Sequence, residues 1–247
     1  MTVYVPNGKF PFCITNLDVT FSEDIIYLLP NNVALDIFSQ SEGGVPENSL
    51  IEWVIEDVFP AGKNFIDIGA HVGTYCINFA KKSNAKDIFA FECQRNTYNC
   101  LCGGIALNQI QNINTYNVAL GSPKQVGKKD LHIISHDGGG SSICTELPTH
   151  TNPLKKETVQ VLTLDSFGIT NIGLIKMDVE GNELNVLKGA VQTLKASNYP
   201  KILFEVWDND WYKLQRERLF SFLRNLGYEI IPILGYKQMF LAEIQCK

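Results

Sequence analysis

The sequence lacks long apolar runs, a secretion signal and an excess of positive charge. No apolar run approaches the ~18 residues that cross a bilayer, and residues 1–10 have neither the basic start nor the apolar centre of a signal peptide. Lys and Arg total 21 against 26 Asp and Glu, giving a net charge of -5, whereas nucleic-acid binding needs clustered cations. We therefore expect a soluble, cytoplasmic protein with no membrane span and no nucleic-acid partner.

Cysteine is present, but not in the patterns of a disulfide framework or a zinc site. The 7 cysteines form no C-x-x-C pair, and their odd number favours a reduced compartment. His132, His136 and His150 do not show zinc-site spacing with them. The 247 residues, 45% of them hydrophobic, suit one α/β domain.

An apolar strand runs into a turn with two glycines at 65–73. Gly69 and Gly73 permit a close approach of backbone or ligand that a Cβ would block. The turn has neither the middle glycine of a dinucleotide fingerprint nor the lysine of a P-loop. Its spacing, with Asp67 two residues before the first of two glycines four apart, resembles the first motif of class I S-adenosylmethionine-dependent methyltransferases.

Strand and helix patterns then alternate, as a doubly wound sheet requires. Periodicity predicts strands at 64–68, 87–92, 114–119, 158–163, 174–178, 202–206, 228–233 and 239–243. It predicts helices from Ser49, from about Thr74, and at 96–108, 183–194 and 214–226, with Ser49 and Glu52 as a capping box. We expect about seven mostly parallel strands, closed by a C-terminal antiparallel hairpin.

Residues 1–45 contain short β-like runs at 17–21, 25–29 and 33–37, broken by Pro30, Asn31 and Asn32. They predict a short N-terminal β extension, or lid, that packs on a core domain of residues 46–247.

Ligands of open α/β sheets bind beyond the carboxyl ends of the strands. Glu92 ends the strand after the glycine turn, where a carboxylate can accept hydrogen bonds from ribose hydroxyls; an ordinary exposed glutamate is the alternative. Asp67 either faces a methionine ammonium group or supports the turn backbone. The free amides of the turn are available to the methionine carboxylate.

A second run at 178–190 reads D-V-E-G-x-E-x-x-V-L-x-G-A. It resembles the FkbM family of S-adenosylmethionine-dependent methyltransferases, and the resemblance extends over roughly 44–242. The family is mostly associated with O-methylation of sugars, glycolipids and natural products. Two residues depart from its usual pattern, since His71 stands where members have Asn and Cys93 where they have Pro.

The resemblance implies a Rossmann-like class I methyltransferase fold, S-adenosylmethionine as the cofactor and a hydroxyl acceptor on a sugar or glycoconjugate. A lipid or natural-product hydroxyl is the alternative acceptor, and an NAD-dependent oxidoreductase is a more distant alternative. The implied cofactor-binding residues are Asp67, Gly69, Ala70, His71, Val72, Gly73, Thr74, Tyr75, Glu92, Cys93, Ser142 and Asp178.

An alcohol acceptor must lose its proton as the new C–O bond forms, and a carboxylate can take it. Asp178 is the first candidate, with Glu180 and Glu205 second; the alternative for Asp178 is binding without proton transfer. Mg²⁺ held by the same carboxylates would polarise a sugar diol, and this alternative stays open.

Two further segments are candidates for contact with the acceptor. Residues 138–142, in a long polar connection, are either a lid over the acceptor or a mobile connector. Trp207, Trp211 and Tyr212 suit stacking against sugar C–H faces, and ordinary packing is the alternative.

Overall fold

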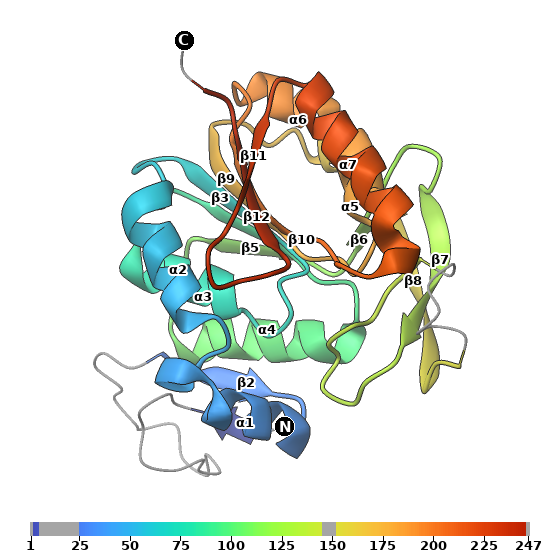
Figure 1. The fold of residues 1–247 in the computed structure, drawn as a ribbon. Coiled ribbons are helices and arrows are strands. Elements are labelled where there is room, and N and C mark those ends of the chain that lie inside the picture. Colours follow the sequence, from blue (N-terminus) through green and yellow to red (C-terminus); the bar gives the residue numbers. More distant parts are fainter. Residues whose placement is uncertain (1, 5–24, 145–151, 246–247) are drawn as a thin grey trace.

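The structure, a computed structural model, describes residues 2–4, 25–144 and 152–245. A seven-stranded sheet runs through its centre, with helices on both faces (Figure 1). In order across the sheet, the strands are β11 (Glu229–Pro232), β12 (Met239–Glu243), β10 (Lys201–Glu205), β9 (Ile172–Met177), β3 (Asn64–Ile68), β4 (Ile88–Phe91) and β5 (Ile113–Tyr116). The strands from β10 to β5 are parallel, and β12 is antiparallel to both of its neighbours.

Both faces of the sheet are buried, because the central strands carry apolar side chains on either side. In β3, Phe65 belongs to one hydrophobic core and Ile66 to the other. The first core is covered by α2 (Asn48–Trp53), α3 (Thr74–Lys82) and α4 (Arg95–Leu107). The second is covered by α5 (Glu183–Lys188), α6 (Val191–Ala196) and α7 (Lys213–Asn225).

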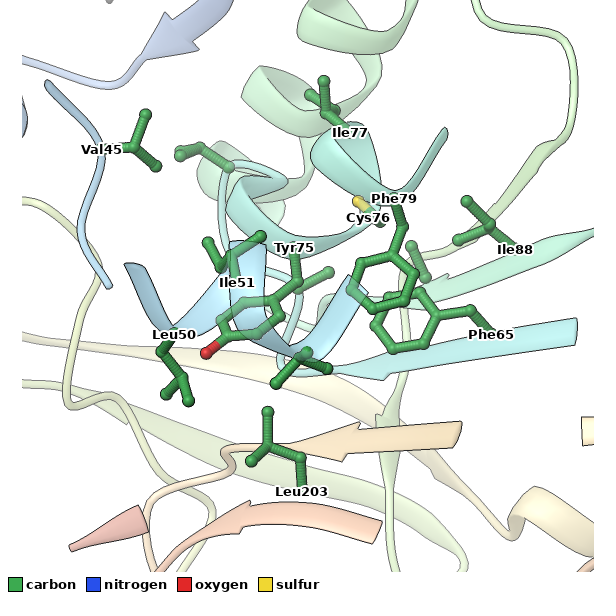
Figure 2. Packing of buried hydrophobic residues seen from close by; sticks show 14 of the residues in the cluster. Val45, Leu50, Ile51, Phe65, Tyr75, Cys76, Ile77, Phe79, Ile88 and Leu203 are labelled. Atoms are coloured by element: carbon green, nitrogen blue, oxygen red, sulfur yellow. The ribbon is translucent and has the colours of Figure 1, made fainter. Parts of the chain in front are cut away.

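The first core holds a polar group at its edge. The rings of Phe65 and Phe79 stack with their centroids 3.8 Å apart. Tyr75 lies in the same core as Ile51 (Figure 2). Its hydroxyl donates a hydrogen bond out of the core to Glu47 Oε2, at 2.7 Å. Hydrophobic packing therefore fixes a hydrogen-bond donor near the end of the sheet.

Two smaller sheets accompany the main one. One contains β6 (Ala119–Leu120), β8 (Lys155–Leu162) and β7 (Gly127–Ile133). The other pairs β1 (Thr2–Tyr4) with β2 (Tyr27–Leu29), and is followed by α1 (Asn32–Gln40). β2 lies against α4, where a Cβ on Gly103 would come within 2.5 Å of Leu28. A π-helical turn at Val54–Val58 extends α2, and 3-10 helices occupy Glu42–Gly44, Leu164–Phe167 and Asp210–Tyr212.

The α/β class and the mixed sheet are confirmed, but the strands are distributed differently from the prediction. The predicted strand at 114–119 is divided between β5 and β6, and the strand predicted at 158–163 pairs with β6 and β7 outside the main sheet. The predicted helix at 183–194 is two helices. Asp165 accepts hydrogen bonds from the backbone of Gln192 and Thr193, which starts α6 as a separate helix.

Two N-terminal predictions are wrong. Residues 33–37 are helical in α1 rather than β-like, because the side chain of Asn31 caps the helix by accepting from Ala34 N at 3.1 Å. The capping box is also wrong, since Glu47 rather than Ser49 is the N-cap residue of α2. The run predicted at 17–21 lies outside the described residues.

Candidate functional site

A cavity of about 320 Å³ lies at the carboxyl ends of β3, β4 and β9. The glycine turn after β3, Glu92 after β4 and Asp178 after β9 line it. Residues 137–143 form another wall, and α1 contributes the apolar side chains of Ala34, Ile37 and Phe38. The site therefore combines the ends of the parallel strands with two segments that close over them.

Gly69 is required by the protein backbone itself. Gly69 has φ +79°, and a Cβ there would lie 1.8 Å from the carbonyl oxygen of Asp178. The amides of Gly69 and Ala70 both donate to Phe91 O, at 2.9 and 3.0 Å. Gly73 N donates to Ala70 O at 2.8 Å. These three amides already donate to backbone carbonyl oxygens. They therefore do not support the prediction that free amides of the turn bind a ligand carboxylate.

Glu92 is a buried carboxylate held by two backbone donors. His71 N donates to Oε2 at 2.9 Å and Gln94 N to Oε1 at 2.7 Å. Burial raises the pKa of Glu92, while His71 and these two amides oppose that rise. Each carboxylate oxygen keeps a second lone pair, and Glu92 lines the cavity. The group can therefore accept further hydrogen bonds from a ligand.

His71, which departs from the family pattern, joins the turn to the 137–143 wall. It has φ +52°, and its Nε2 lies 3.0 Å from Asp137 O. The same wall is held elsewhere by Ser142, whose hydroxyl donates to Glu180 O at 2.7 Å and accepts from Cys144 N at 3.0 Å. The wall thus has fixed contacts with both ends of the cavity.

Lys176 is a buried cation at the other end of the cavity. Its Nζ lies 3.5 Å from Asp178 Oδ2 and 4.9 Å from the centroid of the Tyr75 ring. Burial alone would lower the pKa of Lys176, but Asp178, Asp67 and Glu47 together raise it. Sequence reasoning missed this residue. A lysine inside the apolar run of β9 was the available signal, because a buried charge needs a partner.

Glu180 and Glu205 lie close to Asp178 and to each other. Burial, followed by the negative charge of Asp178, raises the pKa of Glu180 to about 9. The same two causes, in the same order, raise the pKa of Glu205 to about 8. Asp178 and both glutamates surround a crevice together with Trp207 and Tyr212, and this crevice is too narrow to admit a water molecule. At neutral pH the two glutamates therefore hold protons and can donate hydrogen bonds.

The rest of the 178–190 motif holds the chain in place. Glu183 accepts from Gly181 N at 3.0 Å and from the Tyr212 hydroxyl at 3.1 Å. Asn182 donates to Leu120 O at 3.0 Å. A Cβ on Gly189 would lie 2.1 Å from Gly121 O. The motif thus joins cavity-lining carboxylates to residues that fix their backbone.

The structure brings most of the sequence-predicted residues together. Those that line the main cavity are Gly69, His71, Thr74, Tyr75, Glu92, Cys93, Ser142, Asp178 and Glu180. Those that do not are Asp67, Ala70, Val72, Gly73 and Glu205. Asp67 is fully buried, and its Oδ2 accepts at 3.0 Å from Cys76 N in the first turn of α3. Besides Lys176, sequence reasoning missed Glu47 and Ile37 as cavity residues.

The described residues contain a cluster of three aromatic rings and five free thiols. The ring centroid of Trp207 lies 5.4 Å from the ring centroid of Trp211 and 5.4 Å from that of Tyr212. Within the described ranges, no group of three or more His, Cys, Asp or Glu residues is placed to hold a metal ion. The Mg²⁺ alternative therefore finds no support there. The five described cysteines are free thiols, and no described helix is both long and apolar enough to cross a membrane.

The Methyltransferase FkbM domain model matches residues 67–230 of the chain. No curated protein matches the sequence. The solved structure of methyltransferase FkbM from Methylobacillus flagellatus KT is 16% identical with a TM-score of 0.50, over 73% of this chain and 43% of that one. A precorrin-6y C5,15-methyltransferase from Geobacter metallireducens GS-15 is 12% identical with a TM-score of 0.50, over 85% and 94%.

A ribosomal protein L11 methylase from Lactobacillus delbrueckii subsp. bulgaricus is 14% identical, also with a TM-score of 0.50, over 80% of this chain and 77% of that one. At these identities the three structures establish a shared Rossmann-like methyltransferase fold.

Proposed function

The chain belongs to the FkbM methyltransferase family, and on that premise we propose that it transfers the methyl group of S-adenosylmethionine to a hydroxyl group of a sugar or glycoconjugate. The observation that carries this proposal is the single cavity that joins Glu92, at the end of β4, to Asp178, at the end of β9, across the glycine turn. This arrangement can hold a nucleoside at one end and a reacting group at the other.

S-adenosylmethionine, the methyl donor, fits the cavity with its ribose at Glu92 and its methionine part toward Asp178. Glu92 offers carboxylate lone pairs to the ribose hydroxyls. The apolar residues Ala119, Leu120 and Ile143 also line the cavity and offer an apolar surface to an adenine ring. The methionine part then lies over the turn after β3, toward Asp178 on the neighbouring strand.

When bound, S-adenosylmethionine supplies a methyl group that its positively charged sulfur has already activated. The residues of the chain therefore act mainly by positioning the acceptor. Asp178, paired with Lys176 at 3.5 Å, takes the proton of the acceptor hydroxyl as the bond to carbon forms. Glu180 and Glu205 have pKa values raised by burial to about 9 and about 8, so they donate hydrogen bonds to the acceptor instead.

Polar and aromatic groups beside the main cavity support a polar, ring-shaped acceptor. Asp178 and Glu180 line that cavity and can bind hydroxyls, and the half-buried Trp207 lies beside them with an aromatic face. A lipid or natural-product hydroxyl remains the second candidate. It is favoured by α1, whose side chains Ala34, Ile37 and Phe38 give the main cavity an apolar wall. The same contacts support residues 1–45 as a lid on a domain of residues 46–247.

Donor binding is the first test. The purified protein is titrated calorimetrically with S-adenosylhomocysteine and with NAD as the control. We expect micromolar binding of the former and none of the latter. Failure to bind S-adenosylhomocysteine would overturn the proposal.

Acceptor identity is the second test. Methyl-labelled S-adenosylmethionine is incubated with the protein and a panel of sugars, glycolipids, lipids, natural-product alcohols and RNA. We expect label in a sugar or glycolipid. Label in RNA alone would contradict both the acceptor class and the expected absence of a nucleic-acid partner. Repeating the active reaction with EDTA, and then with added Mg²⁺, tests the metal alternative.

A further inference from the structure

Glu47 occupies an unusual position at the edge of the cavity. It precedes α2 and has φ +59° and ψ +25°, a left-handed conformation that residues with a side chain seldom adopt. Its side chain makes no helix-capping hydrogen bond. Non-glycine residues in this conformation persist where the surrounding structure fixes them, commonly at ligand sites. His71 and Glu180, which also line the cavity, share the conformation.

The carboxylate of Glu47 is fixed from one side. Oε2 accepts the hydrogen bond of the Tyr75 hydroxyl at 2.7 Å, and the Tyr75 ring is buried in the core. Burial, together with the charge of Glu47, raises the pKa of Tyr75 well above its usual value, so the hydroxyl remains a donor. Among the hydrogen bonds of the described residues, none engages Oε1 of Glu47. One carboxylate oxygen therefore remains available to a ligand.

The order of the strands places Glu47 at the methionine end of the donor. Across the sheet, β4 carries Glu92, β3 carries the glycine turn, and β9 carries Lys176. Glu47 shares the cavity with Lys176 and with Tyr75, which lies in the first turn of α3. A donor whose ribose contacts Glu92 and which extends across β3 brings its amino-acid part to these residues.

The other nearby carboxylates have different partners. Asp67 is fully buried and does not line the cavity; its Oδ2 accepts from Cys76 N, and its Oδ1 has no hydrogen-bond partner among the described residues. Asp178 pairs with Lys176. We propose that Glu47, upstream of the matched segment 67–230, binds the ammonium group of the methionine part of the donor. This assignment depends on the proposed use of S-adenosylmethionine, and it gives the N-terminal part of the chain a direct role in donor recognition.

The test removes the charge of Glu47, the ammonium group of the ligand, or both, and compares the resulting affinities. Wild-type protein and Glu47→Gln are each titrated calorimetrically with S-adenosylhomocysteine and with its deaminated analogue, S-adenosyl-4-thiobutyrate. We expect the wild type to bind the analogue at least about tenfold more weakly than S-adenosylhomocysteine, because a charge-assisted hydrogen bond is lost. The variant should bind the two ligands with similar affinities.

Controls separate this proposal from the proposed function. Glu42→Gln, at an exposed glutamate of the same segment, should retain the wild-type preference for S-adenosylhomocysteine. Glu47→Asp keeps the charge but shortens the side chain, so its preference for S-adenosylhomocysteine should be intermediate. This variant replaces Glu47→Gln in the test if Glu47→Gln does not fold. An unchanged preference in both Glu47 variants would overturn the assignment while leaving the proposed function intact. Absence of S-adenosylhomocysteine binding to the wild type would overturn both.

Discussion

The two ends of the cavity present carboxylates in opposite ways. At the donor end, the charge of Glu92 is met by two backbone N–H groups, from His71 and Gln94. At the transfer end, Asp178 and Glu180 line the cavity, Glu205 lies beside them in the adjoining crevice, and Lys176 pairs with Asp178. Fixed amides prepare a carboxylate to bind, whereas crowded carboxylates hold and exchange protons. The difference suggests that the first end binds the nucleoside of the donor and the second performs the chemistry.

Asp178→Asn gives the largest effect expected from this comparison. It removes the group that accepts the proton and keeps the shape of the side chain. We expect kcat to fall about 10²- to 10⁴-fold, measured by label transfer to the acceptor found in the panel. Asp130→Asn, at an exposed aspartate of β7, should leave kcat unchanged.

Donor binding distinguishes this result from misfolding. Asp178→Asn should still bind S-adenosylhomocysteine within about tenfold of the wild type, because the base acts on the acceptor. A variant with full activity would remove Asp178 from the chemistry.

Gly69→Ala tests whether the close approach of Asp178 O is the reason that position 69 needs a glycine. Its Cβ would lie 1.8 Å from Asp178 O, at a backbone φ of +79°. We expect a loss of about 3 kcal/mol or more in the free energy of unfolding, since strain and overpacking add. Gly62→Ala is the matched control, because Gly62 has φ +74° and no atom within 4 Å of the added Cβ. It should lose only about 1 kcal/mol, as measured by urea denaturation.

Equal losses in the two variants would contradict the close-approach explanation. They would mean that the left-handed backbone alone requires glycine at position 69. The comparison therefore separates conformational strain from the collision of two strand ends.

The donor end was largely predictable from the sequence, because its signals are local. A buried strand, two glycines and an acidic residue on the next strand are each visible in a short window, and β3, β4 and Glu92 lie where the pattern places them. The sequence alone did not show why position 69 needs a glycine. The atom that a Cβ would strike belongs to Asp178, more than a hundred residues later.

The transfer end depends on contacts between distant segments. Glu47, Tyr75 and Lys176 come from three separate elements, and only packing brings them together. The β-like run predicted at 33–37 contains β-branched side chains, which favour a strand, while the cap at Asn31 and the burial of Phe38 favour the helix that forms. The side-chain hydrogen bond and the tertiary burial therefore outweigh the local strand propensity.

Glu92→Gln tests the donor end directly. The amide cannot accept from both backbone donors and also serve two ribose hydroxyls. We expect S-adenosylhomocysteine to bind about 10- to 100-fold more weakly, as for loss of a hydrogen bond to a charged group. Calorimetry checks this, with the exposed Glu56→Gln as control. Methylthioadenosine, which keeps the ribose, should lose affinity to the same extent. Weakening of S-adenosylhomocysteine alone would contradict ribose binding.

The smallest expected effect is the pH dependence of stability at the transfer end. Burial and nearby charge raise the pKa of Glu205 from 4.5 to about 8 and that of Glu180 to about 9. Between about pH 5 and pH 8 the folded chain therefore binds more protons at these groups than the unfolded chain does. Their contribution to stability must fall as the pH rises, by at most about 1.4 kcal/mol per pH unit for each group.

Urea denaturation at pH 5.5, 6.5 and 7.5 measures this contribution as a difference between variants. Glu205→Gln removes one titrating carboxyl, so its stability relative to the wild type should increase steadily from pH 5.5 to 7.5. The exposed Glu217→Gln on α7 should show no such trend. A Glu205→Gln difference that stays constant with pH would mean that the carboxyl is ionised throughout. The transfer end would then resemble the donor end, and the contrast between binding and proton-holding carboxylates would be lost.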